Sequence, residues 1–575
     1  MLADIQSILH SLYGQEKGNQ AYAQLLTRLR GLQSAPVGGK RWSPSHQDAI
    51  LITYPDQVTQ KGKRPLATLF DFLKRYAEQS ISVIHILPFF PSTSDDGFSI
   101  KDYRAVDPSY GNWDDIQNLG NSFRLMFDAV INHTSASHPW FEEYLAGNSE
   151  FDRYYISVEG TPDLAKVVRP RSLPLLTSYK TPSGDRRIWT TFSADQVDLN
   201  FENPKVLIDI LDLIMFYVSK GASLMRLDAV AYLWKEIGTD CIHRPQTFRI
   251  VQIIRRMFDE WAPDVQLITE TNVPHEDNLS YLGDGYNMSH MVYNFTLPPL
   301  LLYTLQSGSC EALNKWLTQL ELPIGKVTFL NFLASHDGIG INPLKDVLSA
   351  DQVEQVLQRT KRLGGLVSYK TDETGHEVPY ELNINYFDAL GIGEGDKRSE
   401  GSRDLQIERF VCAHAILVAL KGIPALYFHS LFGSQGWLDG VKLTGRDRTV
   451  NRQKLKVEDL VKELETPGSN RSRIYNRLVG LLSARASHPA FDPYGEQQVV
   501  YLSKGVFAIL RHSEKTPNIV LCLHNITELY QSVKIKELLI TSGLKYFKDI
   551  ISNREIELEP LGELTLSPYQ VYWLG

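Results

Sequence analysis

Eight short apolar runs, which alternate with longer amphipathic stretches, constrain the fold of this chain more than any other feature. Each run is rich in β-branched or aliphatic residues and has the length of one buried strand. The runs are 49–54, 82–88, 125–130, 223–228, 265–270, 291–295, 327–332 and 423–428. Strands that alternate with helices form a parallel sheet, and eight such units are the number that closes a barrel. The sequence therefore predicts an α/β fold, a (β/α)8 TIM barrel.

The other segments predict attachments to this barrel. Apolar positions at helical spacing before residue 33 indicate a helical hairpin. The gap between the third and fourth runs is about twice the others, and its Pro/Gly/Ser-rich middle predicts an inserted subdomain of loops. A second long loop, 343–402, follows the seventh run, and short alternating strands from Pro493 onward predict a C-terminal β-sandwich. The expected boundaries are 1–45 for the N-terminal helical extension, 46–133 with 193–490 for the barrel, 134–192 for the inserted subdomain and 491–575 for the C-terminal β domain.

Composition narrows the class of partner. The chain has 59 Lys and Arg against 67 Asp and Glu, so it lacks the basic field that nucleic-acid binding requires. No apolar run reaches membrane-spanning length, and the first ten residues lack the basic and apolar regions of a signal peptide. The four cysteines are widely separated, with no CxxC pair, and lie in apolar settings typical of a core. We therefore expect a cytoplasmic protein that acts on small molecules, with no nucleic-acid or membrane partner.

Polar residues end four of the eight runs. They are Asp128 with Asn132 and His133, Arg226 with Asp228, Glu270, and His336 with Asp337. In a barrel, the carboxyl ends of the strands face one shared mouth, so these groups can converge. Glycosyl transfer with retention needs one carboxylate to attack the anomeric carbon and a second carboxyl, about 5–5.5 Å away, to protonate the leaving oxygen. An arginine two residues before a strand-end aspartate points the same way and keeps that aspartate ionised.

Each of these sites has a simpler interpretation when taken alone. An Arg-x-Asp at a strand end is more often a structural ion pair, Glu270 could be a charge at a helix N-terminus, and His336-Asp337 before a glycine could belong to a turn. Four such sites on the right strands in one order favour the catalytic interpretation. No metal-ligand cluster is evident, and we expect no cofactor.

The motifs 128–133, 226–230, Glu270 and 336–337 resemble those of the α-amylase clan of glycoside hydrolases. The resemblance covers nearly the whole chain from about Ile50. It implies that Asp228 is the nucleophile, Glu270 the general acid/base and Asp337 the transition-state stabiliser. It also implies that His133, Arg226 and His336 hold the glucosyl ring.

Within this clan the sequence is similar to sucrose phosphorylase and its relatives. The similarity rests on segments 52–56, 87–90, 95–98, 111–114, 169–171, 235–239, 295–300, 336–340 and 448–452. It implies that Asp95 and Arg448 clamp the hydroxyls of a terminal glucose. It also implies that Phe98, Phe192 and Tyr232 form the apolar wall of a pocket that takes one glucosyl unit.

The acceptor side departs from sucrose phosphorylase. Asn272 stands where those enzymes carry a histidine, and Val378 and Glu381 stand where their acceptor loop has Asp and Gln. The run 268–278, segments 331–335 and 379–381 and the N-terminal hairpin resemble the glucosylglycerate phosphorylase branch instead. That branch converts 2-O-α-glucosyl-D-glycerate and inorganic phosphate into α-D-glucose 1-phosphate and D-glycerate. The alternatives are a sucrose, sucrose 6'-phosphate or glucosylglycerol phosphorylase, a hydrolase, and a non-catalytic scaffold.

Arg169 and Arg171 flank a proline in the inserted segment. They are either a solvated basic loop or the anion subsite, where a guanidinium pairs with phosphate or the glycerate carboxylate. We expect Arg171 to serve this subsite separately from the residues that clamp glucose. A homodimer is left open.

Overall fold

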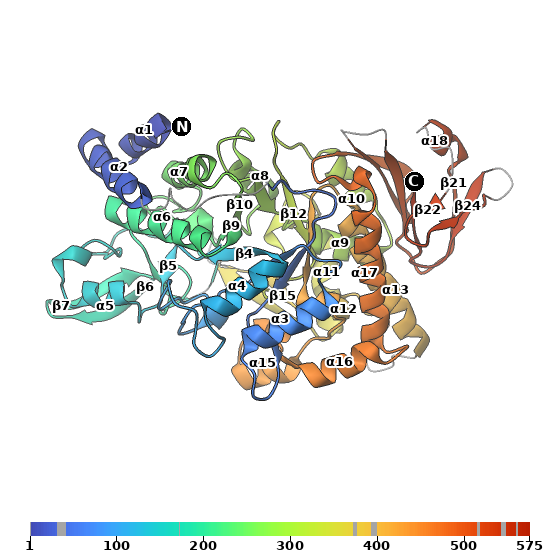
Figure 1. The fold of residues 1–575 in the computed structure, drawn as a ribbon, viewed down its shortest axis with the longest axis horizontal. Helices are drawn as coiled ribbons and strands as arrows, with labels where there is room; N and C mark the ends of the chain where they lie inside the picture. Colours follow the sequence, from blue (N-terminus) through green and yellow to red (C-terminus); the bar gives the residue numbers. More distant parts are fainter. Residues whose placement is uncertain are drawn as a thin grey trace.

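Eight parallel strands close into a barrel at the centre of the molecule (Figure 1). The computed structural model describes residues 2–30, 42–171, 173–371, 376–392, 400–513, 518–541, 548–558 and 562–575. Around the barrel the strands are β1 (Ile50–Thr53), β3 (Val83–Ile86), β4 (Arg124–Ala129), β9 (Ala222–Leu227), β10 (Gln266–Thr269), β11 (Met291–Tyr293), β12 (Thr328–Phe332) and β16 (Ile423–Tyr427), which pairs with β1. Each strand overlaps one of the predicted runs, so the predicted (β/α)8 barrel is confirmed.

Helices on the outside of the barrel explain why its strands are apolar on both faces. The main helices are α3 (Pro65–Tyr76), α4 (Trp113–Ser122), α6 (Pro204–Ser219), α7 (Pro245–Trp261), α9 (Leu297–Ser307), α10 (Glu311–Thr318), α13 (Glu400–Ala419) and α17 (Asn470–Ala486). Every residue of β1, β3, β10, β11, β12 and β16 is buried. Parallel strands covered on both sides lose the polar–apolar alternation of a half-exposed sheet.

The N-terminal hairpin packs against the outside of the barrel. Helices α1 (Leu2–Tyr13) and α2 (Gln15–Arg30) lie against α7 and α6 (Figure 1). Gly14, between the two helices, has a φ of 79°, a left-handed angle that glycine adopts without strain. A Cβ on Gly18 would lie 2.7 Å from the His10 ring, so the close packing of the two helices requires a glycine there.

The inserted segment contains more regular structure than the loops that the sequence predicts. Strands β6 (Leu176–Thr181) and β7 (Gly184–Trp189) form an antiparallel hairpin, preceded by α5 (Pro139–Leu145). Short strands β5 (His133–Thr134) and β8 (Val197–Asp198) pair at the base of the insertion. The residues of β6 are half-buried or exposed, so the sequence has no apolar periodicity that would predict this strand.

The long segment after β12 also contains regular elements in place of the expected loop. Helix α11 (Ala350–Arg362) is followed by β14 (Leu366–Thr371) and β15 (Glu377–Asn383), which pairs with both β14 and β13 (Ile339–Gly340). The pairing of β13 with β15 joins residues about 40 positions apart, and local sequence pattern does not reveal such a contact. Part of this segment, 372–375 and 393–399, lies outside the described residues.

Further short elements complete the barrel rim. They are α8 (His275–Leu279), α12 (Tyr386–Ala389), α14 (Phe428–Leu431), α15 (Leu438–Thr444), α16 (Val457–Glu465), 3-10 helices at Asp95–Gly97, Val230–Tyr232 and Asp447–Asn451, and the parallel pair β2 (Val58–Thr59) with β17 (Leu455–Lys456). The tight turn at 95–97 and the 3-10 helix at 447–451 carry Asp95 and Arg448 toward the barrel mouth.

The C-terminal region is a β-rich domain, as predicted. A six-stranded sheet contains β18 (Glu496–Ser503), β19 (Val506–His512), β20 (Ile519–Asn525), β25 (Val571–Leu574), β22 (Lys548–Asp549) and β23 (Arg554–Glu555). A separate pair, β21 (Gln531–Lys534) and β24 (Glu563–Leu566), has α18 (Lys536–Thr541) between its strands in sequence. Alternate residues of β19 belong to two cores: Ala508 packs with Leu564 and Leu566, whereas Phe507 belongs to the main core.

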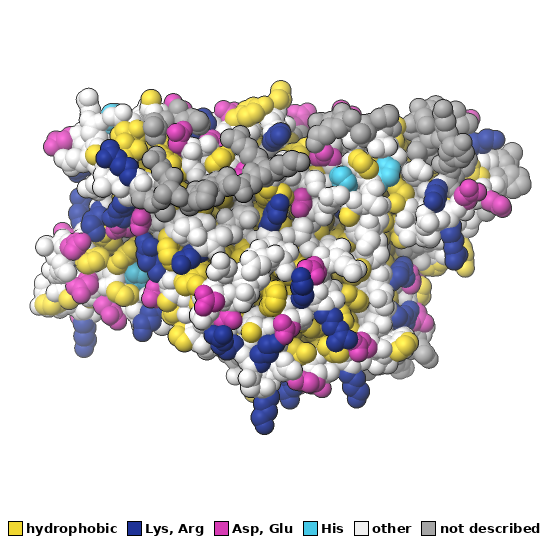
Figure 2. Space-filling model, viewed as in Figure 1, with side chains coloured by type: hydrophobic (Ala, Val, Ile, Leu, Met, Phe, Trp, Pro, Cys, Tyr) yellow, Lys and Arg dark blue, Asp and Glu magenta, His cyan; other side chains and the backbone are white. Residues whose placement is uncertain are grey.

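The surface has no dominant charge on the face shown in Figure 2, where acidic and basic side chains are interspersed. Among the residues that the structure describes, no helix combines the length and apolarity needed to cross a membrane.

Candidate active site

Arg226 and Asp228 meet Asp128 at the carboxyl ends of β9 and β4. Arg226 lies beside Asp128 in the strand register, and its guanidinium is only 3 % exposed. Nη1 of Arg226 donates to both the Asp128 and the Asp228 carboxylate, and its distance to Asp228 Oδ1 is 2.8 Å. On its other side, Asp128 pairs with His85 Nε2 at 2.9 Å. Although burial raises the pKa of Asp128, Arg226 and His85 lower it to about 2, so the Asp128 carboxylate is a fixed charge that holds Arg226 in place.

Glu270 lies one residue beyond β10, next to Asp228, which follows β9. The ladder pairs Thr269 with Leu227, so the two carboxyl residues extend from neighbouring strands. Neighbouring strands are about 4.8 Å apart, which is compatible with the carboxyl separation that retention requires. The Ala229 N–H donates to Glu270 Oε2 at 2.9 Å and fixes the orientation of this carboxyl group.

Both carboxyl groups hold their protons to a higher pH than exposed carboxyl groups do. Burial raises the pKa of Asp228 to about 8; Arg226 opposes this effect and the nearby Glu270 charge adds to it. Burial likewise raises the pKa of Glu270. Arg226 lies 2.8 Å from Asp228 but 3.7 Å from Glu270, so it favours the ionised form of Asp228 more strongly than that of Glu270. An ionised nucleophile beside a protonated acid is the state that glycosyl transfer starts from.

Asp337, at the end of β12, is held by two arginines. Arg448 donates to Asp337 Oδ1 at 2.6 Å, and Arg452 donates to the same oxygen at 3.3 Å. Burial alone would raise the pKa of Asp337, but Arg448, His336 and Arg452 hold it well below its usual range. Arg448 also makes bonds of 3.1 and 3.0 Å to Glu381, whose other oxygen accepts from the Gly338 N–H.

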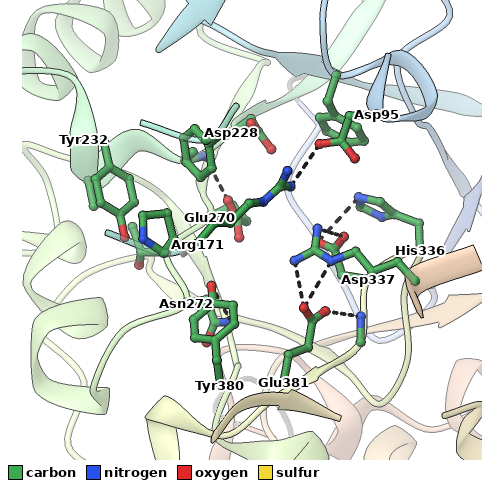
Figure 3. Close-up of a pocket in the computed structure, with 18 of the residues that line it drawn as sticks. Asp95, Arg171, Asp228, Tyr232, Glu270, Asn272, His336, Asp337, Tyr380 and Glu381 are labelled. Atoms are coloured by element: carbon green, nitrogen blue, oxygen red, sulfur yellow. Dashed lines mark hydrogen bonds and ion pairs between the residues drawn. The ribbon is translucent and has the colours of Figure 1, made fainter. Parts of the chain in front are cut away.

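Asp95 accepts hydrogen bonds from two sides of the cavity. Arg171 Nη2 reaches Asp95 Oδ2 at 3.1 Å (Figure 3). Gln196 Nε2 reaches the same oxygen at 3.2 Å. Burial raises the pKa of Asp95, but Arg171 and Arg452 reverse this effect and hold it well below its ordinary value. The expected separation of Arg171 from the glucose clamp is therefore wrong: the Arg-Pro-Arg loop folds back so that Arg171 pairs directly with a clamp residue.

The aromatic residues predicted from sequence lie in two contacting pairs. Phe98 stacks on His336 with ring centroids 4.9 Å apart, and Phe192 meets Tyr232 edge-on at 5.5 Å. His133 lies 5.3 Å from Phe192, ring to ring, and its Nε2 is 3.0 Å from the Phe98 carbonyl oxygen. Burial lowers the pKa of both histidines and is the largest influence on each.

A buried ion pair supports His133 from behind. Lys235 Nζ lies 2.6 Å from Asp198 Oδ2 and donates to Asn132 Oδ1 at 2.8 Å. The Asn132 amide donates to Asp198 at 3.1 Å and lies 3.3 Å from His133 Nδ1. The side chains of Lys235 and Asp198 are 3 % and 0 % exposed, so each charge depends on the other.

All but two of the predicted site residues line one cavity. The predicted lining residues are Asp95, Phe98, His133, Arg171, Phe192, Asp228, Tyr232, Glu270, Asn272, His336, Asp337, Glu381 and Arg448. Arg226 lies beneath this cavity with Glu270 and Asp337, and Arg169 is half-buried outside the lining. Asn272 Nδ2 is 3.5 Å from the Tyr380 hydroxyl, while its Oδ1 is buried with no hydrogen-bond partner among the residues that the structure describes (Figure 3).

Four residues of this site have no role predicted from the sequence. They are His85, Gln196, Tyr380 and Arg452. Arg452 stands in segment 448–452, which resembles sucrose phosphorylase, so this resemblance could have identified it as a site residue. Tyr380 likewise stands in segment 379–381, which resembles the glucosylglycerate phosphorylase branch, and it reaches the cavity from β15. Gln196 reaches the cavity from the position just before β8, where no pattern in the sequence marks it.

Comparison with known proteins agrees with this geometry. The α-amylase catalytic domain matches residues 66–375, more than half of the chain. The chain belongs to the α-amylase family. Within that family, the glucosylglycerate phosphorylase of Spirochaeta thermophila is 42 % identical over 99 % of this chain and 98 % of its own length. The glucosylglycerate phosphorylase of Escherichia coli is 39 % identical over the full length of both chains.

Other α-amylase-family phosphorylases are more distant. The sucrose phosphorylase of Streptococcus mutans is 26 % identical over 84 % of this chain and 97 % of its own. The crystal structure of sucrose 6F-phosphate phosphorylase from Thermoanaerobacter thermosaccharolyticum superposes with a TM-score of 0.73, at 25 % identity, over 85 % of this chain and 96 % of that one. The resemblance predicted from the strand-end motifs is thus confirmed, including its greater likeness to the glucosylglycerate branch.

Proposed function

We propose that this protein is a retaining phosphorylase that converts 2-O-α-D-glucosyl-D-glycerate and phosphate into α-D-glucose 1-phosphate and D-glycerate. The observation that carries this proposal is the Asp228–Glu270 carboxyl pair above Arg226. Three glucosylglycerate phosphorylases are 39–42 % identical to the chain over nearly its whole length, which supports the choice of substrate.

In the first half-reaction Asp228 attacks the anomeric carbon. Arg226 engages Oδ1 of this carboxylate, so Oδ2 is the oxygen that we assign to the attack. As the new C–O bond forms, the bond to glycerate breaks and Glu270 transfers its proton to the departing oxygen. The product of this step is a glucosyl-enzyme ester and free D-glycerate.

In the second half-reaction phosphate replaces glycerate. The Glu270 carboxylate, now without its proton, takes a proton from phosphate while a phosphate oxygen attacks the anomeric carbon. The ester bond to Asp228 breaks, and two inversions leave the α configuration unchanged. Glu270 is then protonated again and ready for the next donor molecule.

The glucosyl unit occupies the part of the cavity between Asp95 and Asp337, which we call the glucosyl subsite. Asp95, Asp337 and Arg448 offer charged hydrogen-bonding groups to its hydroxyls, as the resemblance implies. Phe98 and the Phe192–Tyr232 pair offer apolar faces to the ring. Asp337 is also placed to stabilise the positive charge that develops on the ring in the transition state.

Arg171 is proposed as the group that binds the anions. Both glycerate and phosphate are anionic, and guanidinium pairs well with carboxylate and phosphate oxygens. Its present bond to Asp95 implies an exchange of partners, because the glucosyl unit and Arg171 compete for the same carboxylate. Asn272, whose buried oxygen has no partner within the described part of the chain, and Glu381 complete the proposed acceptor side. Arg169 is a second candidate for the anion.

The decisive experiment is phosphate-dependent release of glucose 1-phosphate from four donors: glucosylglycerate, glucosylglycerol, sucrose and sucrose 6'-phosphate. We expect turnover with glucosylglycerate to exceed that with the other three, and to require phosphate. Faster turnover of another donor would show that this donor is the substrate. Release of glucose without phosphate, as fast as release of glucose 1-phosphate with it, would show that the enzyme is a hydrolase. Asp228→Asn, purified in the same way, controls for contaminating activity.

The cytoplasmic location and the homodimer are separate parts of the proposal. The four free, buried cysteines are compatible with a reducing compartment. Cell fractionation tests the first expectation, and light scattering on the purified protein tests the second.

A further inference from the structure

Arg452 joins three segments beneath the glucosyl subsite. Its Nε donates to the His336 carbonyl oxygen at 2.8 Å, and Nη2 donates to Asp337 Oδ1 at 3.3 Å. Nη1 donates to Asp96 Oδ2 and lies 3.7 Å from Asp95 Oδ1. The side chain is 4 % exposed, so these contacts lie within the protein.

The turn that carries Asp95 needs such a partner. Asp95 and Asp96 have φ angles of 53° and 49°, a left-handed conformation that non-glycine residues rarely adopt. Gly97 follows with a φ of 108°, and a Cβ there would lie 2.7 Å from the Pro88 carbonyl oxygen. Backbone of this kind persists only where surrounding contacts over-determine it. The Arg452–Asp96 contact is one such constraint, and it acts on the residue next to Asp95.

Arg452 also separates two charges that repel each other. Asp95 and Asp337 are both buried acceptors of the glucosyl subsite, and the Asp95 charge raises the pKa of Asp337. Arg452 lowers the pKa of both carboxyl groups. Arg171 contacts Asp95 too, but it is 29 % exposed and reaches across the space that a glucosyl unit would fill. Arg452 can stay in place when that space is occupied.

We infer that Arg452 is a positioning residue for the glucosyl subsite: it holds the Asp95 turn and Asp337 at a fixed separation, so that both carboxylates meet the hydroxyls of one glucosyl unit. This inference rests on the proposed function only in assuming a glucosyl donor. The identity of the acceptor does not enter it, because Arg452 contacts the clamp residues.

The test uses α-D-glucosyl fluoride, whose hydrolysis requires the glucosyl subsite and the carboxyl pair but neither glycerate nor phosphate. Arg452→Lys keeps the charge but cannot bond three acceptors in a planar fork. We expect kcat/KM for this donor to fall about 10- to 100-fold, as for the loss of a charge-assisted hydrogen bond. Asp96→Asn, which weakens only the contact to the turn, should show a smaller loss in the same direction.

A pH profile distinguishes positioning from a general loss of structure. Asp337 faces Arg448, Arg452 and His336, and the carboxyl groups of Asp95, Asp228 and Glu270. With one cation less well placed, the acid limb of kcat/KM should move to higher pH in Arg452→Lys. Reduced stability alone would lower the folded fraction without moving this limb.

Arg485→Lys is the matched control. Arg485 is 1 % exposed and donates to backbone carbonyl groups, including Asp48, Gly422 and Phe491, at 3.0–3.2 Å. Its replacement should lower the melting temperature while the folded enzyme keeps its kcat/KM and its acid limb.

The inference fails if Arg452→Lys, or Asp96→Asn where the lysine variant does not fold, keeps wild-type kcat/KM and acid limb per folded molecule. It also fails if Arg485→Lys reproduces the shift. Because glucosyl fluoride bypasses the acceptor, a wrong choice of natural donor would leave this result intact.

Discussion

The Arg226 guanidinium donates a 2.8 Å hydrogen bond to the Asp228 carboxylate from a position that is almost completely buried. The same side chain holds Asp128 and lies 3.7 Å from Glu270. One guanidinium therefore faces three carboxyl groups, and it is closer to Asp228 than to Glu270. This difference in distance favours the ionised form of Asp228 over that of Glu270, so the two carboxylic acids can take different roles in the same cavity.

Replacing Asp228 by Asn should abolish glucosyl transfer, because an amide cannot form the glucosyl ester that divides the reaction into two steps. Intact-mass spectrometry after incubation with glucosyl fluoride should show the adduct on wild-type protein under trapping conditions and none on the variant. Circular dichroism checks that the variant is folded. Near-normal turnover by folded Asp228→Asn would remove Asp228 from the mechanism.

Glu270→Gln should impair natural donors more than activated ones. General acid catalysis contributes about 10²–10⁴-fold, and fluoride leaves with little help from an acid. Single-turnover glucosylation measured with glucosylglycerate and with glucosyl fluoride gives the comparison. Equal losses with both donors would contradict the acid role.

The glucosylation rate should fall at alkaline pH, at a higher pH than an exposed glutamate would give, because burial raises the pKa of the acid Glu270. A raised pKa means that Glu270 keeps its proton to a higher pH, and that glucosylation stops when Glu270 has none to donate. A pH series of single-turnover rates should show this alkaline limb with glucosylglycerate and a weaker one with glucosyl fluoride. Identical alkaline limbs with the two donors would show that a group other than Glu270 causes the loss of rate.

Arg171→Ala should weaken the use of phosphate and of glycerate together, by about 1.5–3 kcal/mol for a lost charge-assisted hydrogen bond. Because the substitution also frees Asp95, hydrolysis of glucosyl fluoride should not decrease. Apparent KM values for phosphate and, in the reverse direction, for glycerate measure the effect. Arg153, 61 % exposed in the same inserted segment, is the matched control. Unchanged values for both anions would make Arg169 the next residue to test.

Lys235→Met should destabilise the protein by about 3–5 kcal/mol, because Asp198 would remain as an unpaired buried charge. Adding Asp198→Asn should restore part of the loss. Urea unfolding measures both variants. The control is Lys205→Met. The Lys205 side chain is 38 % exposed and lies 3.4 Å from Asp209, so its replacement should change the free energy of unfolding by less than about 1 kcal/mol. A loss no larger than in this control would show that the pair contributes little.

Residue order alone determined the barrel and the location of its chemistry. Eight apolar runs gave the eight strands, because strands covered on both faces must be continuously apolar. The polar residues that end four of these runs had to reach one mouth, since all strands of the barrel point the same way. Asp228, Glu270 and Asp337 were therefore predictable as a group, and their motifs identified the family before any contact was known.

Tertiary structure alone decided which charges meet across the cavity. Arg171 and Asp95 are 76 positions apart, and Arg452 and Asp96 are 356 apart. Such pairs depend on how loops fold over the barrel mouth, and side chains of one type in a loop are equivalent until the backbone places them. For the same reason the sequence could nominate an arginine loop for an anion but could not show that Arg171 pairs with a glucose-clamp carboxylate. Nor could it show that Arg452 ties the two clamp carboxylates together from below.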